Sequence, residues 1–336
     1  MLFLSFDLSF SILDLSPITE GNTPTNALAN SLDLIQHAEK WGYERYWVAE
    51  HHNMKGIASA ATAVVIGHLA GGTATIRVGA GGIMLPNHAP LVIAEQFGTL
   101  ASLFPGRIDL GLGRAPGTDQ ITAHALRRSL SGNVDDFPRD VVELQHYFKE
   151  QEPGQRVTAV PGAGTNIPLY ILGSSLFGAQ LSGMLGLPFA FASHFAPAML
   201  NQAIEVYREH FKPSDQLQEP YLMLGFNVCA ADTTEEADYL RSSSMLSLLS
   251  MRTGAPRQLP PPVANLRDNL SKEELHILNN TPRCAAFGNI DEIREGMSAF
   301  IKEHNANELI LVSSVFDHNA RLRSYEITMD AAQGID

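Results

Sequence analysis

One stretch of the chain is more informative than any other: Arg107-Ile-Asp-Leu-Gly-Leu-Gly-Arg-Ala-Pro-Gly-Thr-Asp119. Its apolar run, residues 108–112, predicts a buried strand. The strand leads into a turn that holds Gly111, Gly113 and Gly117, with Arg114 at its start. Glycines let backbone N–H groups approach an anion, and a guanidinium can bind two phosphate oxygens at once. The stretch therefore indicates an α/β protein that binds a phosphorylated ligand at the end of a strand.

Strand-like and helix-like segments alternate on both sides of this stretch. Apolar runs predict eight strands, and a segment with helical spacing follows each one. This pattern, without a change of composition between the halves, predicts an α/β fold of the TIM type. We therefore expect residues 1–336 to form one (β/α)8 barrel domain, whereas a doubly wound sheet usually has fewer strands. The strands are expected at residues 10–15, 43–49, 76–80, 108–112, 168–172, 189–192, 221–230 and 308–313.

Two connections are longer than a minimal barrel needs, residues 151–166 and 254–282. Long connections in a compact domain are typical of lids, of binding loops or of mobile segments. We expect both as insertion loops at the C-terminal face of the barrel, and residues 254–282 are a candidate lid.

The composition excludes several classes of partner. The chain has 336 residues, of which 45% are hydrophobic, and its 23 basic and 36 acidic residues give a net charge of −13. This charge argues against nucleic acid or an anionic membrane as the main partner. The first seven residues lack the basic start of a signal peptide, and no run is long enough to span a membrane. Cys229 and Cys284 lie far apart, so we expect a cytoplasmic protein without disulfides.

The predicted strand ends carry most of the residues that could perform chemistry. In a barrel these ends meet at one face, where active sites lie. The residues at these ends are Glu50, His51, His52, Asn53, Gly81, Gly82, Asn87, His88, Arg114, Gly173, Ser174, Ser175, Ser193, His194, Ser313 and Ser314.

Several of these residues have more than one interpretation. His51, His88 and His194 could form a metal site, but adjacent His51 and His52 point to opposite faces of a strand, and we expect no metal. The glycines from 111 to 117 are one residue off the dinucleotide-binding fingerprint and could simply form a tight turn. Ser175 could cap a helix, bind a phosphate, or do both. Spacing alone favours an ordinary surface role for Arg139.

Five motifs follow one another between about residues 8 and 330. They are Trp47-Val-Ala-Glu-His-His52, Arg77-Val-Gly-Ala-Gly-Gly-Ile-Met-Leu-Pro86, Gly106-Arg-Ile-Asp-Leu-Gly-Leu-Gly-Arg-Ala-Pro-Gly117, Ile167-Pro-Leu-Tyr-Ile-Leu-Gly-Ser-Ser175 and Leu185-Gly-Leu-Pro-Phe189. In this order they resemble the luciferase-like flavin-dependent monooxygenase family. The segment Met84-Leu-Pro-Asn-His-Ala-Pro90 is similar to the branch near the bacterial luciferase α-subunit, and less so to the deazaflavin (F420) branch.

The resemblance implies a (β/α)8 barrel that binds reduced FMN, supplied by a separate flavin reductase. It implies an oxidoreductase, a monooxygenase that uses O2 through a flavin C4a-peroxide on a small organic substrate of unknown identity. His51 matches the family's catalytic histidine. Gly81 and Gly82 match a non-proline cis peptide under the isoalloxazine. The residues that match the FMN phosphate site are Arg114, Arg139, Gly173, Ser174 and Ser175.

The sequence also departs from the luciferase pattern. Gly113 stands where luciferase has a reactive cysteine, so light emission and an aldehyde substrate are not supported. The resemblance implies a homodimer, in which the helix expected at residues 59–71 could take part. A flavin-binding protein without turnover and a metal-dependent barrel hydrolase are the alternative functions.

Overall fold

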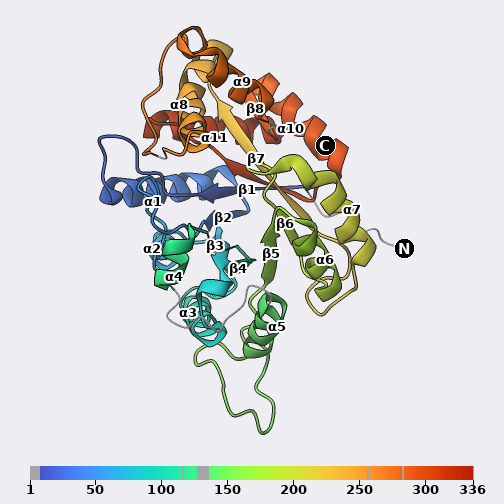
Figure 1. Ribbon diagram of the computed structural model, residues 1–336. Helices are drawn as coiled ribbons and strands as arrows, with labels where there is room; N and C mark the ends of the chain where they lie inside the picture. The colour runs from blue at the N-terminus through green and yellow to red at the C-terminus, as the bar shows by residue number, and fades with distance from the viewer. Residues whose placement is uncertain (1–7, 116, 127–135, 256, 282–283, 336) are drawn as a thin grey trace.

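The computed structural model describes residues 8–115, 117–126, 136–255, 257–281 and 284–335. Parallel strands lie at the centre of the molecule and helices surround them (Figure 1). The strands are β1 (Ser9–Asp14), β2 (Arg45–Val48), β3 (Arg77–Met84), β4 (Ile108–Gly113), β5 (Leu169–Gly173), β6 (Phe189–Phe191), β7 (Leu222–Ala230), β8 (Ala285–Gly288) and β9 (Glu308–Val312). The α-helices are α1 (Pro24–Trp41), α2 (Thr62–Gly71), α3 (Pro90–Leu103), α4 (Gln120–Leu126), α5 (Phe137–Phe148), α6 (Leu176–Leu185), α7 (Leu200–His210), α8 (Thr234–Arg252), α9 (Lys272–Asn280), α10 (Ile290–His304) and α11 (His318–Ala332).

Of the nine strands within the described residues, eight close into a barrel. Their order is β6-β5-β4-β3-β2-β1-β9-β7, and pairing between β6 and β7 completes the ring. The eight strands expected from the sequence are the eight strands of this ring, so the predicted (β/α)8 barrel is confirmed. The extra strand, β8, was not predicted. It pairs with the second half of β7, from Asn227 to Ala230, beside the ring.

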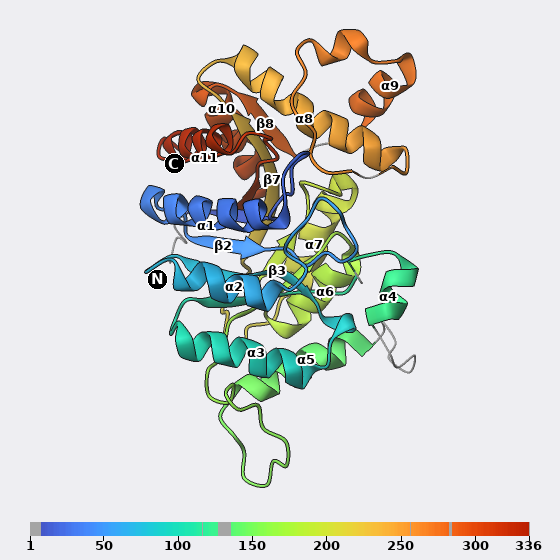
Figure 2. The same ribbon diagram turned by 90° about the vertical axis from the view of Figure 1, so that its left-hand side faces the viewer.

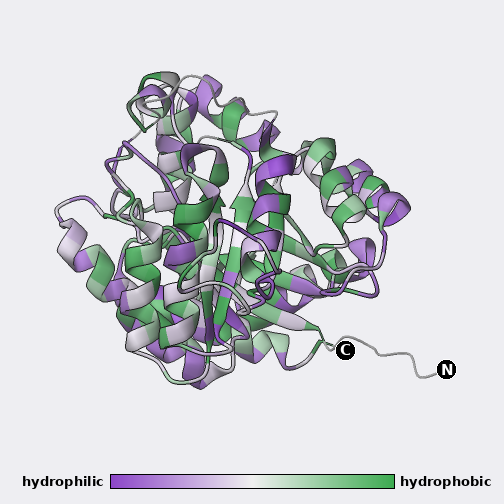
Figure 3. Ribbon diagram, turned by 90° about the horizontal axis from the view of Figure 1, so that it is seen from below, coloured by the Kyte–Doolittle hydropathy of each residue, from purple (hydrophilic) through white to green (hydrophobic). Residues whose placement is uncertain are grey.

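The strands form because their short apolar runs can be buried on both faces. Side chains that point outward pack against the helices in the main apolar cluster. Side chains that point inward, such as Trp47, Tyr170 and Met223, form a second cluster that fills the barrel. Figure 3 shows hydrophobic residues along the central strands and along the helix stripes that face them. The barrel is therefore a packed core and not a pore.

Helix boundaries follow local signals in the sequence. Thr23 and Asn26 form a capping box at the start of α1, and Gly42 ends the helix in the left-handed conformation. Pro90 is the first residue of α3, as the sequence predicted. No helix within the described ranges combines the length and apolar character that a membrane crossing requires.

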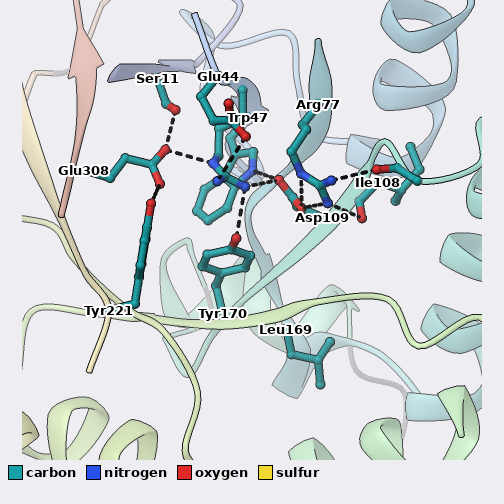
Figure 4. Close-up of polar contacts among 12 residues, drawn as sticks. Ser11, Glu44, Trp47, Arg77, Ile108, Asp109, Leu169, Tyr170, Tyr221 and Glu308 are labelled. Carbon is teal, nitrogen blue, oxygen red and sulfur yellow. Dashed lines mark hydrogen bonds and ion pairs between the residues drawn. The ribbon is translucent and has the colours of Figure 1, made fainter. Parts of the chain in front are cut away.

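Buried ion pairs close the barrel end at which the strands begin (Figure 4). Arg45 of β2 donates to Asp109 of β4 at 2.7 Å and to Glu308 of β9 at 2.8 Å. The hydroxyl of Tyr170 accepts from Arg45 at 2.9 Å, and that of Tyr221 donates to Glu308 at 2.7 Å. The network thus links strands on opposite sides of the ring.

Asp109 also accepts two hydrogen bonds from Arg77 and one from Trp47. Burial alone would raise the pKa of Asp109, but Arg45 and Arg77 outweigh it and the pKa lies below the ordinary value. Both oxygens are paired, so the carboxylate is stable as an ion in the core.

The two long connections lie in different places. Residues 151–166 connect the end of α5 to the start of β5, so this loop begins and ends at the face where the strands start. This corrects its expected placement at the C-terminal face. The connection from 254 to 282 contacts loops at the C-terminal face of the barrel. Its residues 256 and 282 lie outside the described residues. Leu259 pairs with Thr19, and the N–H of Glu20 donates to the Leu259 carbonyl at 2.9 Å.

Candidate functional site

The predicted site residues gather where the strands of the barrel end. Figure 2 shows β2 pointing toward the side of the molecule that carries α4 and the loops before α9. We call this end of the barrel the mouth. His51 follows β2, Arg114 follows β4, and Ser174 and Ser175 follow β5.

Arg114 stacks on a side chain from the first turn of α6. Its guanidinium carbon is 4.2 Å from the ring centroid of Phe177, the second residue of that helix. Ser175 is the N-cap residue of α6, with extended backbone, but its side chain makes no capping hydrogen bond. The guanidinium of Arg114 thus contacts the helix that Ser175 begins. Such a combination binds phosphate or another oxyanion.

The peptide bond between Gly81 and Gly82 is cis, as the resemblance implied. Both residues lie in β3, and the register between β3 and β4 shifts between Ala80 and Ile83. A Cβ atom on Gly82 would lie 2.7 Å from the carbonyl oxygen of Gly111. Only glycine allows the backbones of β3 and β4 to approach so closely at the mouth.

His51 is half-buried and lies beside the loop that carries Arg114. Its Nδ1 is 3.4 Å from the carbonyl oxygen of Gly117. A carbonyl can only accept, so Nδ1 carries the proton and Nε2 of the neutral ring keeps a lone pair. Burial lowers the pKa of His51, and the Gly117 carbonyl and Glu50 only partly oppose this effect. The imidazole is therefore a neutral proton acceptor at neutral pH.

Glu50 organises two other histidines beside His51. Its buried carboxylate accepts from Nε2 of His52 at 2.8 Å, from Nε2 of His88 at 2.9 Å and from the N–H of Met84 at 3.0 Å. Burial would raise the pKa of Glu50, but the hydrogen bonds from His88 and His52 outweigh it and the pKa is lowered. Glu50 thus ties the loop after β3 to the end of β2. The sequence analysis placed Glu50 only among the residues at strand ends and assigned it no role. The signal that could have revealed its role is an acidic residue directly after a buried strand.

His194 is a second imidazole at the mouth, after β6. Its Nδ1 is buried and has no hydrogen-bond partner in the part of the chain that the structure describes. Burial, and then the charge of His51, lower the pKa of His194 to about 4. The two rings are therefore close enough to affect each other electrostatically.

Arg139, another predicted phosphate ligand, pairs with acidic side chains near the start of α5. It is in the first turn of α5, its side chain is 71% exposed, and it pairs with Asp136 at 3.3 Å and Asp140 at 3.5 Å. Residues 127–135, which precede this turn, and Pro116 of the glycine-rich turn lie outside the described residues. The phosphate-binding role of Arg139 stays a prediction.

The histidines do not form a metal centre with one another. Among the described residues, no group of three or more histidine, cysteine, aspartate or glutamate side chains could hold a metal ion. His88 binds to Glu50, and His51 binds to the Gly117 carbonyl. The chemistry of this donor set is that of hydrogen bonding and proton transfer.

The candidate lid forms one wall beside the mouth. Arg257 pairs with Glu20 at 3.2 Å, and both line a groove of about 580 Å³ together with Ile18, Pro24, Lys55 and Gln258. Farther along, Leu266 and Leu278 pack against Met245 and Leu249 of α8. The segment therefore has an apolar cluster of its own and is docked onto the loop after β1. Its function as a lid stays a prediction.

Comparison with known proteins places this site in a family. Residues 8–326 match the family model described as luciferase-like monooxygenase. A protein of Escherichia coli K12 named luciferase-like monooxygenase is 52% identical over 326 residues, which cover 97% of each chain.

Solved structures share the same architecture. The apo-MsnO8 crystal structure has a TM-score of 0.87 and 32% identity, and the match covers 97% of this chain and 98% of that one. The oxygenating constituent of 3,6-diketocamphane monooxygenase of Pseudomonas putida, in complex with FMN, has a TM-score of 0.74. It is 16% identical over 98% of this chain and 99% of that one, and so shows the fold alone. The identity to the Escherichia coli protein and the family match agree with the barrel and its mouth: the chain belongs to the luciferase-like monooxygenase family.

Proposed function

We propose that this protein is an FMN-dependent monooxygenase that uses reduced flavin and O2 to oxygenate a small organic substrate. One observation carries the proposal: the Arg114 guanidinium stacks on Phe177 of the first turn of α6, the helix whose N-cap residue, Ser175, makes no capping hydrogen bond with its side chain. The loop that begins with Arg114 also reaches His51 through Gly117. An oxyanion anchor and a neutral base therefore share one loop.

The residues at the mouth fit the parts of FMN. Arg114, Ser174, Ser175 and the N–H groups after Gly173 would hold the phosphate, because guanidinium and helix N-terminus both favour an anion. Arg139 would add a second positive charge from the start of α5. Gly81 and Gly82 in β3 would lie next to the isoalloxazine, as the resemblance implies.

When bound, reduced flavin supplies the two electrons with which one oxygen atom of O2 enters the substrate and the other leaves as water. His51 would hold or accept a proton at Nε2, while Gly117 orients its ring through Nδ1. Glu50 would hold the loop after β3 in place through His88 and the N–H of Met84. The apolar side chains below the mouth, among them Leu13 and Leu172, would exclude water from the reaction.

Two partners complete the proposal. A separate flavin reductase would supply the reduced FMN, in the cytoplasm, where the free thiols of Cys229 and Cys284 stay reduced. A homodimer through α2 and α3 would cover Val64, Val92 and Leu103, which are exposed apolar side chains on these helices.

Anaerobic titration of the purified protein with FMN, reduced FMN and riboflavin tests the cofactor. We expect FMN and reduced FMN to bind more tightly than riboflavin, because riboflavin lacks the phosphate. Absence of binding of both FMN forms below high micromolar concentrations would overturn the proposal.

Catalysis is tested separately with a flavin reductase, NADH and a panel of small organic compounds. Substrate-dependent O2 consumption with formation of an oxygenated product is expected. Flavin binding without such consumption over a broad panel would indicate a flavin-binding protein without turnover.

A further inference from the structure

Three segments of the chain form the groove of about 580 Å³ beside the mouth: the loop after β1, the loop after β2 and the candidate lid. The N–H of Ile18 donates to the carbonyl of Gly56 at 2.8 Å, and the N–H of Glu20 donates to the carbonyl of Leu259 at 2.9 Å. A Cβ atom on Gly56 would lie 3.2 Å from the carbonyl oxygen of Arg257. Direct backbone contacts therefore hold the walls of the groove together.

The lining of the groove combines apolar and charged side chains. Ile18 and Pro24 are its apolar members. Lys55 and Arg257 each add a positive charge, and Glu20 adds one negative charge, so one positive charge is in excess. The whole chain, in contrast, has a net charge of −13. A lining of this kind favours an organic anion, because the ligand gains both apolar contact and an opposite charge.

Several donor groups of the groove are free to bind a ligand. The side chains of Lys55 and Gln258 make no hydrogen bond or ion pair with any of the described residues. Arg257 pairs with Glu20 at 3.2 Å and with no other acidic side chain in the part of the chain that the structure describes. An ammonium group and an amide can therefore bind a ligand without the loss of a contact within the protein.

We propose that this groove binds the carboxylate group of the organic substrate, and that Lys55 and Arg257 select for that group. The inference rests on the proposed function for the reaction that the substrate undergoes. Lys55 is four residues after His51, and the loop after β1 follows the strand that pairs with β2. The groove therefore adjoins the strand end that carries the candidate base. Its single excess positive charge matches a carboxylate, whereas a phosphate monoester carries about two negative charges at neutral pH.

Hexanoate, hexanamide and hexylamine are suitable probes, because they share an alkyl chain and differ in charge. We expect the wild-type protein, with and without FMN, to bind hexanoate more tightly than hexanamide and hexylamine least tightly. Ligand-observed NMR titration measures the three affinities. An ionic strength of about 1 M should remove most of the preference for hexanoate, because salt screens the charges of an open groove.

Three variants of the lining should change hexanoate affinity in opposite directions. Lys55→Gln and Arg257→Gln each remove a positive charge and should weaken hexanoate about twofold to fivefold, the effect of one exposed ion pair. Glu20→Gln removes the negative charge and should strengthen it by a similar factor. Hexanamide affinity should stay constant in all three. Lys302→Gln, at an exposed position near the end of α10, is the matched control and should change neither affinity.

The assay with flavin reductase connects the groove to turnover. Among substrates that differ only in a carboxylate or its primary amide, the carboxylate should have the lower KM. Lys55→Gln should raise the KM for the carboxylate and leave that for the amide unchanged, which a merely structural effect would not do. The affinity for FMN should stay within about twofold of the wild-type value, because Lys55 carries no phosphate contact in the proposed anchor.

Failure of this inference is distinct from failure of the proposed function. If hexanoate binds no better than hexanamide, or if the three lining variants leave that preference unchanged, the inference is overturned whatever the flavin data show. If the protein turns over carboxylate and amide substrates with equal KM, the inference is overturned and the proposed function stands. If hexanoate binding follows the charges but FMN does not bind, the proposed function is overturned, and with it the identity of the bound carboxylate as a substrate.

Discussion

The carbonyl oxygen of Gly117 lies 3.4 Å from Nδ1 of His51, so the loop that begins with the phosphate-binding candidate Arg114 also orients the imidazole of the candidate base. Gly117 has a positive φ of 65°, and a Cβ atom there would lie 2.9 Å from Cγ of Met84 and 3.0 Å from the carbonyl of Glu50. The proposed phosphate anchor and the candidate base are therefore linked through this residue.

Gly117→Ala is expected to displace this carbonyl. The hydrogen bond to Gly117 raises the pKa of His51, so its loss should lower that pKa further in an NMR titration. Gly21→Ala is the matched control, because Gly21 also has a positive φ, of 83°, but nothing lies within 4 Å of its Cβ position. In both variants the unfavourable φ should lower the free energy of unfolding by about 1 kcal/mol. Gly117→Ala should lower it further, because its Cβ atom would meet Met84 and Glu50. Equal losses of unfolding free energy in the two variants, with an unchanged pKa of His51, would contradict the link between Gly117 and His51.

Arg114→Ala is expected to weaken FMN about tenfold to a hundredfold, since a hydrogen bond to a charged group contributes about 1.5–3 kcal/mol. Riboflavin affinity should stay nearly constant, because riboflavin carries no phosphate. Fluorescence titration measures both affinities. Arg323→Ala, which removes an exposed arginine on α11, is the control and should change neither value. A parallel loss of riboflavin affinity would show that Arg114 does not act on the phosphate.

His51→Ala is expected to leave FMN affinity within about threefold of the wild-type value, because His51 is not part of the phosphate anchor. Hydrogen peroxide released per O2 consumed should rise, since the proton acceptor at the mouth is lost. Because burial lowers the pKa of His51, the wild-type activity should persist below pH 6.5 before its acid decline. His276→Ala, at an exposed position of α9, is the control. An unchanged peroxide yield would contradict the role of His51.

His194 also makes stability depend on pH. Its pKa is about 4 in the folded protein and near 6.5 in the unfolded chain. Between these values the unfolded state binds more protons, so stability falls as the pH is lowered from 6.5 toward 4. His194→Asn cannot titrate and should lose less unfolding free energy than wild type between pH 7 and pH 5. Denaturant titrations at both pH values measure this difference. Equal losses of unfolding free energy in wild type and His194→Asn would contradict the prediction.

Asp109→Asn is expected to lower the unfolding free energy by about 3–5 kcal/mol, because Arg77 loses its carboxylate partner and the buried Arg45 keeps only Glu308. Asp232→Asn breaks an exposed pair with Arg323 and should cost about 1 kcal/mol or less. Urea unfolding compares the two. FMN affinity of the folded Asp109→Asn protein should be unchanged, since the network lies at the barrel end opposite the mouth.

The ring of strands could be predicted because each strand is a short apolar run between turn residues. Strand β8 escaped prediction, since Ala285-Ala-Phe-Gly288 has no β-branched residue and becomes a strand only by pairing with β7. Helix α9 had a local signal that was not used: Ser271 and Glu274 form a capping box.

Some residues of the candidate site could be predicted from the sequence, and others could not. His51, Arg114 and Ser175 are recognisable from motifs along the chain, and the cis bond at Gly81 was implied by the resemblance. The environment of His194 depends on Gly225 and Asn227, more than thirty residues later, whose approach only the closed ring creates. No spacing rule in the sequence could have predicted that contact.

The ionic network around Arg45, Asp109 and Glu308 closes one end of the barrel, and the packed layer of Trp47, Tyr170 and Met223 lies above it. Packed side chains and ion pairs therefore separate the mouth from the opposite end of the barrel. A flavin and a second ligand bound at the mouth would both exchange with solvent on the side where the strands end.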